Sequence, residues 1–228
     1  MPDDYVTIVS GLPRSGTSLM MQMLQAGGMA LLTDGRRAPD EHNPCGYFEH
    51  EGVKHSRSDV SWLEHAGGKV VKVVHLLLPH LPTSRNYRVI FMLRDLEEVI
   101  VSQRIMLRHQ GRPVTVLTDT ALAGVFEKQL STVRQWLARQ PNLSVLHVNH
   151  RDVIGDPLIV AGQINFFLTG NLRVADMAAA VDPALYRQRK SAQRRPVPVH
   201  RPSSAELSAT LLSCELAVND SGACSLPP

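Results

Sequence analysis

The stretch Gly11-Leu12-Pro13-Arg14-Ser15-Gly16-Thr17-Ser18 decides the fold of this 228-residue chain. It follows a β-rich run, residues 5–10, and leads into a helical pattern that ends at the Gly27-Gly28 pair. Glycines in such a turn let backbone N–H groups converge on an anion, and a helix N-terminus adds partial positive charge. The segment therefore predicts a phosphate-binding loop between a strand and a helix.

The individual residues of this loop indicate which kind of phosphate compound it binds. The two glycines have the G-x-x-x-x-G spacing of a P-loop, and Ser18 stands where the terminal hydroxyl belongs. Thr17 replaces the lysine that reaches the β- and γ-phosphates in nucleoside triphosphatases, and the positive charge comes from Arg14 instead. The loop therefore predicts phosphate binding, and its lack of this lysine argues against a nucleoside triphosphate as the ligand.

Strand and helix patterns alternate along the chain. Largely apolar runs without alternation predict strands buried on both faces at 70–74 and 89–93, and another buried strand at 143–148. A β-rich run at 5–10 and the segment 29–32 are further candidate strands. Helical patterns separate them, at 17–27, 95–109, 119–139 and 156–168. This alternation predicts an α/β fold, with a parallel β-sheet flanked by helices. Residues 33–68 are expected to form a long loop with one helix around Val53–His65.

Length and charge divide the chain into two parts. Residues 1–190 are expected to form one domain, and 191–228 a C-terminal extension for which disorder and a short helix at 205–216 are both open. Of the 24 basic and 21 acidic residues, six and three follow Tyr186, so residues 1–186 carry no net charge. A neutral body argues against a nucleic-acid-binding domain, which spreads basic charge over a folded face.

Targeting and cysteine patterns favour the cytoplasm. The N-terminus lacks a secretory signal, and no apolar stretch reaches the ~18 residues of a membrane span. Three scattered cysteines are too few for a disulfide framework, which favours reduced thiols. His50 and His55 give only a weak metal-ligand pattern, so no metal is expected.

A second candidate anion site follows a later strand. Arg94 ends the run Phe91-Met92-Leu93, and Ser102 follows it by eight residues on the expected helix. Open α/β sheets place ligands at the carboxyl ends of their strands, and an arginine with a hydroxyl can grip one phosphate. Taken alone, a surface salt bridge of Arg94 with Glu97 or Glu98 would be the better explanation, with Ser102 an incidental helix residue.

Taken together, these motifs resemble the sulfotransferases that use 3′-phosphoadenosine 5′-phosphosulfate (PAPS), and most of all their compact bacterial branch. Residues 13–18 are similar to the family's 5′-phosphosulfate loop, and Arg94 with Ser102 resembles its 3′-phosphate site, with the same interval. Residues 146–157 are similar to the family's strand, turn and Asp-Pro helix start, with His150-Arg151 in place of an aromatic-acid pair. The resemblance implies a P-loop nucleoside triphosphate hydrolase-like sulfotransferase fold.

The resemblance also implies residue roles. Arg94 and Ser102 would hold the 3′-phosphate of PAPS, and no metal would be needed. The family's C-terminal Arg-Lys-Gly contact to that phosphate is not present as such, and Arg187, Arg189 and Lys190 are its possible substitutes or a solvated tail. The 5′-phosphate and sulfonate would be held by Arg14, Ser15, Gly16, Thr17 and Ser18, with Arg14 steadying charge on the oxygen that bridges phosphorus and sulfur.

Sulfonyl transfer also needs a base for the acceptor, and three residues are candidates. The resemblance implies a glutamate after the first helix or a histidine after the third strand. Glu49 closes the segment 43–49, in which Tyr47 and Phe48 would wall an acceptor pocket. His75 ends its strand one residue later than the family's Lys-x-His spacing places it, and Asp34 is the third candidate. We favour Glu49 first, then His75, then Asp34.

The sequence thus predicts a sulfotransferase that moves a sulfonate from PAPS to a hydroxyl or amine. The acceptor would be a small molecule or a group on a carbohydrate or peptide, with residues 33–68 and 104–116 shaping its pocket. A P-loop kinase is one alternative, which Thr17 disfavours. A relative that binds the nucleotide without transfer is the other.

Overall fold

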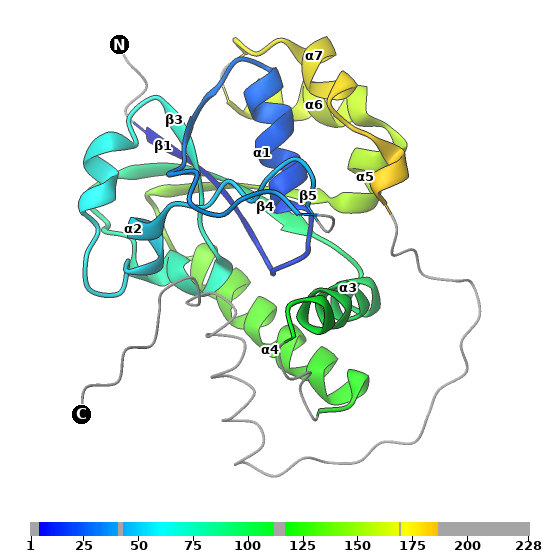
Figure 1. Ribbon diagram of the computed structural model, residues 1–228. Coiled ribbons are helices and arrows are strands. Elements are labelled where there is room, and N and C mark those ends of the chain that lie inside the picture. Colours follow the sequence, from blue (N-terminus) through cyan, green and yellow to red (C-terminus); the bar gives the residue numbers. More distant parts are fainter. Residues whose placement is uncertain (1–4, 41–42, 112–116, 169, 187–228) are drawn as a thin grey trace.

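The computed structural model describes residues 5–40, 43–111, 117–168 and 170–186 (Figure 1). Among these residues, five parallel strands form one sheet in the order β2-β3-β1-β4-β5. The strands are β1 Tyr5–Gly11, β2 Ala30–Leu32, β3 Lys69–Lys72, β4 Asn86–Leu93 and β5 Leu143–Asn149. β1 lies at the centre, where Ile8 pairs with Val71 of β3 and Val89 of β4. The predicted α/β fold with a parallel sheet is confirmed.

Helices cover both faces of the sheet. The α-helices are α1 Thr17–Ala26, α2 Glu51–Lys54, α3 Leu96–His109, α4 Asp119–Leu137, α5 His150–Gly155, α6 Pro157–Phe167 and α7 Val174–Ala179. Short 3₁₀ helices occupy Ser61–His65, His75–His80 and Pro183–Leu185. Figure 1 shows α1, α6 and α7 on one side of the sheet, and α3 and α4 on the other. No helix in the described part of the chain is both long and apolar enough to cross a bilayer.

The strands build a separate core on each face, because successive side chains point to opposite sides. Ile8 and Phe91 pack on one face against Val133 of α4. Val9 and Ile90, their neighbours in sequence, pack on the other face against the methionines of α1. This double burial explains why the inner strands β1, β3 and β4 are largely apolar runs. The expectation that 143–148 is buried on both faces is wrong, because β5 is an edge strand in which only Val148 is buried.

Several boundaries differ from those predicted. The single helix expected around Val53–His65 is wrong, because α2 ends at Lys54 and a separate 3₁₀ helix begins at Ser61. The Asp59 carboxylate accepts hydrogen bonds from the backbone and hydroxyl of Ser61, and such local bonds compete with helix formation. The helices α5 and α7 were not predicted as separate elements. The predicted 191–228 extension and its 205–216 helix lie outside the described residues.

The fold brings the candidate functional residues together at one edge of the sheet. All strands are parallel, so their carboxyl ends meet at the same edge. β1 leads into the loop 11–18, β3 ends at Lys72, β4 is followed by Arg94, and β5 by His150. Side chains far apart in the sequence are therefore brought to one place.

A core substitution tests this packing. Phe91 on β4 is fully buried, so we expect Phe91→Ala to lower the free energy of unfolding by about 3–5 kcal/mol. Phe166 on α6 is 89% exposed, and Phe166→Ala should change it by less than about 0.5 kcal/mol. Denaturant unfolding measures both. Equal changes for the two variants would contradict the described core.

Candidate active site

A pocket opens at the carboxyl edge of the sheet. Its walls come from the loop 11–18, the ends of β3 and β4, the start of α5 and the segment 43–54. Within the loop, Ser15 is 1% exposed and does not line the pocket. The same pocket is lined by Arg94 and Ser102 on one side and by Glu49 on the other. The two anion motifs and the favoured base therefore share one cavity.

The backbone of the phosphate loop takes conformations that few side chains tolerate. Gly16 has φ 100°, and a Cβ atom there would lie 2.5 Å from Cδ2 of His150. Arg14 has φ 69°, which is uncommon for a residue other than glycine. Arg94 donates from Nη1 to the Arg14 carbonyl oxygen at 3.1 Å. This contact stabilises the loop in a conformation that is locally unfavourable.

The two predicted anion sites are hydrogen-bonded to each other. Arg14 donates from Nε to the Ser102 hydroxyl at 3.0 Å, and Arg94 reaches back to the loop as described above. Arg94 also pairs through Nε with Glu98 Oε2 at 3.0 Å, with 10% and 3% of their side chains exposed. The salt bridge considered for Arg94 from the sequence therefore exists, but it is buried beside the pocket rather than on the surface.

Lys72 is a site residue that the sequence reasoning missed. Its ammonium group donates to the Ser18 hydroxyl at 3.2 Å and to the Tyr47 carbonyl oxygen at 2.8 Å. Burial lowers the pKa of Lys72 to about 8, while the negative charge of Glu49 opposes that shift. Lys72 of β3 thus supplies positive charge beside the loop, in which Thr17 replaces the lysine of nucleoside triphosphatases. The available signal was a charged residue at the end of a buried strand.

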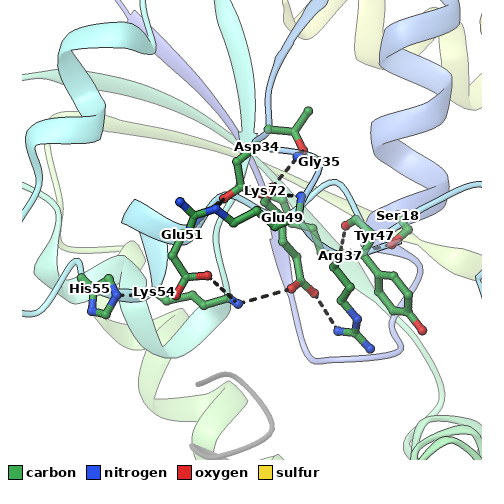
Figure 2. A network of polar contacts seen from close by, with 12 residues as sticks. Ser18, Asp34, Gly35, Arg37, Tyr47, Glu49, Glu51, Lys54, His55 and Lys72 are labelled. Atoms are coloured by element: carbon green, nitrogen blue, oxygen red, sulfur yellow. Dashed lines mark hydrogen bonds and ion pairs between the residues drawn. The ribbon is translucent and has the colours of Figure 1, made fainter. Parts of the chain in front are cut away.

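Glu49 lies in the pocket among cations (Figure 2). Its Oε1 is 3.0 Å from Arg37 Nη1, and its Oε2 is 3.9 Å from Lys54 Nζ. The Arg37 guanidinium stacks 3.3 Å from the centre of the Tyr47 ring. Tyr47 donates in turn to Asp40 at 2.6 Å, and its own burial together with this bond raises the pKa of Tyr47 to about 12. The carboxylate is held in a defined position at the pocket wall.

The other two candidate bases lie outside the pocket lining. His75 is 1% exposed; its Nδ1 donates to the Gly11 carbonyl oxygen, and its Nε2 lies 3.2 Å from Gln129 Oε1. Burial lowers the pKa of His75, and the contacts with Gln129 and Gly11 only partly offset it. This geometry suits a structural histidine better than a base.

Asp34 has a structural position too. Its carboxylate accepts from the backbone N–H groups of Glu51 at 2.6 Å and Arg36 at 3.0 Å. Burial raises the pKa of Asp34, but these hydrogen bonds outweigh it and leave the pKa below its ordinary value. Phe48, expected to wall the acceptor pocket, instead packs into the core on the α1 side, whereas Tyr47 does line the pocket.

His150 replaces the aromatic residue implied by the resemblance, and it lines the pocket next to Gly16 of the loop. Burial, helped by the charge of Arg94, lowers the pKa of His150 to about 4, so its ring is neutral near pH 7. The ring packs edge-on against Tyr186, with centroids 5.0 Å apart. Among the described residues, no group of three or more His, Cys, Asp or Glu side chains is arranged to hold a metal ion.

Comparison with known proteins agrees with this geometry. The profile of the sulfotransferase domain family matches residues 4–194, most of the chain. The chain therefore belongs to the sulfotransferase domain family, and it is a sulfotransferase. The recognition made from the loop and from Arg94 with Ser102 is confirmed.

Solved structures show the same fold at low sequence identity. The sulfotransferase domain from the curacin biosynthetic pathway is 16% identical, with a TM-score of 0.50, over 93% of this chain and 99% of that one. A mouse sulfotransferase complexed with PAP is 18% identical, with a TM-score of 0.52, over 78% of this chain and 62% of that one. No functionally curated protein matches the chain significantly.

The lowered pKa of Lys72 predicts a pH dependence of activity. Its positive charge disappears as the pH rises through about 8 rather than 10.5, so kcat/KM should fall on the alkaline side if the charge stabilises the anionic donor. Lys72→Arg remains charged and should move this limb to higher pH. A pH–rate profile measures the effect in the free enzyme.

Lys69 provides the matched control, because it begins β3 and is not part of the pocket wall. Lys69→Arg should leave the alkaline limb in place. An unchanged limb in Lys72→Arg would assign the titration to another group.

Proposed function

We propose that this sulfotransferase takes its sulfonate from PAPS and transfers it to a hydroxyl or amine of an acceptor. The observation that carries the proposal is a single pocket lined by the loop 11–18, by Arg94 and Ser102, and by Glu49 and Lys72. A donor with phosphates at two positions fits the loop together with Arg94 and Ser102. An acceptor beside the transferred sulfonate fits Glu49 and Lys72.

On the donor side, the chain supplies backbone N–H groups and cations. Residues 14–18 and the N-terminus of α1 would hold the 5′-phosphate and sulfonate. Arg94 and Ser102 would hold the 3′-phosphate, as a guanidinium and a hydroxyl suit a phosphate. Arg14 and Lys72 would stabilise the charge that develops on the bridging oxygen as its bond to sulfur breaks.

On the acceptor side, Glu49 would act as the base. The acceptor oxygen or nitrogen bonds to sulfur, its proton passes to the Glu49 carboxylate, and the bridging oxygen leaves with the electron pair as part of adenosine 3′,5′-bisphosphate. Val53, Leu77 and Met106 line the pocket, which suits an acceptor with apolar surface. The acceptor would be a small molecule or a group on a carbohydrate or peptide, and the expected location remains the cytoplasm.

The sequence leaves two alternative functions, a P-loop kinase and a relative that binds the nucleotide without transfer. Family membership favours sulfonyl transfer over the phosphoryl transfer of a P-loop kinase. A relative that binds the nucleotide without transfer is separated from an active enzyme by direct assay with labelled PAPS and a panel of hydroxyl and amine acceptors.

Nucleotide preference tests the donor assignment. Thermal-shift titration should show stronger stabilisation by adenosine 3′,5′-bisphosphate than by AMP or ATP with magnesium. Arg94→Ala should remove most of the difference between the bisphosphate and AMP, because charge-assisted contacts to one phosphate contribute about 1.5–3 kcal/mol. Arg88→Ala, which removes an arginine of β4 that lies outside the pocket lining, is the control. If the three nucleotides act alike on the unmodified protein, the donor is not PAPS.

The base assignment is tested by Glu49→Gln. We expect turnover to fall by about 10²–10⁴-fold with nucleotide affinity retained, because the amide cannot accept the proton. Glu51 lies two residues away and pairs with Lys54 but is not part of the pocket lining, so Glu51→Gln should keep near-normal turnover. Steady-state kinetics compares the two variants. Normal turnover of folded Glu49→Gln excludes this carboxylate as the base.

A further inference from the structure

Glu98 is a buried carboxylate that the proposed chemistry does not use. It lies on α3, one helical turn after Arg94, is 4% exposed and is not part of the pocket lining. A buried carboxylate is unfavourable unless charged or polar partners compensate it. Its partners therefore indicate why it is placed there.

The first partner is Arg94. Glu98 accepts from Arg94 Nε at 3.0 Å, while Arg94 Nη1 donates to the Arg14 carbonyl oxygen at 3.1 Å. Because a guanidinium is rigid and planar, contacts at two of its nitrogens determine the orientation of the whole group. Glu98 thus connects α3 to the phosphate loop through the side chain of Arg94.

The second partner is Tyr186, at the end of the segment 182–186. Its hydroxyl lies 2.6 Å from Glu98 Oε1 and 2.8 Å from Oε2, and donates to this carboxylate. Its ring packs against His150, which itself lies against Gly16 of the loop. Asp182, Leu185 and Tyr186 line the pocket, so this segment is one of its walls. The same carboxylate therefore anchors a wall of the pocket and orients Arg94.

We propose that Glu98 is a positioning residue that orients Arg94 for the 3′-phosphate of the nucleotide, and that the Tyr186 hydroxyl holds Glu98 in place. The inference rests on the proposed donor. Glu98 acts through geometry rather than charge, because a carboxylate repels a nearby phosphate. An arginine held in its binding orientation loses less conformational entropy when the phosphate arrives. Its loss should weaken binding of the 3′-phosphate more than binding of the 5′-phosphate, which the backbone N–H groups of the loop would also hold.

Two substitutions separate geometry from charge. Glu98→Gln keeps the length of the side chain and an oxygen acceptor for Arg94 and Tyr186, but removes the charge. Glu98→Asp keeps the charge but withdraws the carboxylate by one methylene. The matched control is Glu97→Asp, on the exposed neighbour in the same helical turn. Tyr186→Phe removes only the hydroxyl.

The measurement is the dissociation constant of adenosine 3′,5′-bisphosphate and of AMP for each variant, by calorimetric titration. The quantity of interest is their ratio, the preference for the 3′-phosphate. We expect Glu98→Asp to reduce the preference about 10-fold or more, as for the loss of a hydrogen bond to a charged group. Tyr186→Phe should reduce it by less, about 3–10-fold, because the Tyr186 hydroxyl acts on Arg94 only through Glu98. Glu98→Gln and Glu97→Asp should keep the preference, and in Glu98→Asp and Tyr186→Phe the affinity for AMP should fall less than the affinity for the bisphosphate.

The outcomes are distinct. An unchanged preference in Glu98→Asp overturns the inference, as does a preference lost in Glu98→Gln but kept in Glu98→Asp, which would make charge the cause. Equal losses of affinity for the bisphosphate and for AMP would show that Glu98 has only a general structural role, and would also overturn the inference. If Glu98→Asp does not fold, an unchanged preference in Tyr186→Phe overturns the inference and a reduced one supports it. If the unmodified protein shows no preference for the bisphosphate over AMP, the proposal that PAPS is the donor is wrong, independently of Glu98.

Discussion

The site depends on the contact between its two strand-to-helix junctions. Arg94, after β4, donates to the carbonyl oxygen of Arg14, and Arg14 donates to Ser102 on α3. These bonds hold the phosphate loop in a backbone conformation that Arg14 would not favour alone, with φ 69°. Because β1 and β4 are paired along their whole length, the register of the sheet determines the distance between the junctions. The loop is therefore shaped by tertiary contacts as well as by its glycines.

Buried charge follows from the same arrangement. Arg14, Lys72 and Arg94 all line the pocket, and burial lowers the pKa of Arg14 and of Lys72. Two carboxylates compensate part of this charge, Glu98 beside Arg94 and Glu49 near Lys72. A site arranged in this way is poised for an anionic ligand, whose charge replaces the water that the cations have lost. The neutral body of the chain thus contains a locally positive pocket, which net charge alone could not reveal.

Much of the fold was predictable because its signals are local. The inner strands are largely apolar runs, and α1 starts after a glycine-containing loop, so the parallel sheet could be predicted from the alternation of strand and helix patterns. The helix expected around Val53–His65 failed because the hydrogen bonds of Asp59 with Ser61 interrupt it. Lys72 was missed because its role depends on Ser18 and Tyr47, which lie 54 and 25 residues away. Glu49 remains the proposed base, and it is the one of the three candidates that lines the pocket.

The sequence by itself determined the five strands, the main helices and the glycine-containing loop between β1 and α1, since each of these patterns is local. The tertiary structure alone decided which side chains share the pocket. It turned His75 toward Gly11 and Gln129, kept Asp34 at a helix start, and joined Arg94, Glu98 and Tyr186. The physical reason is that hydrogen bonds and burial act between residues brought together by sheet register, and no local spacing encodes that register.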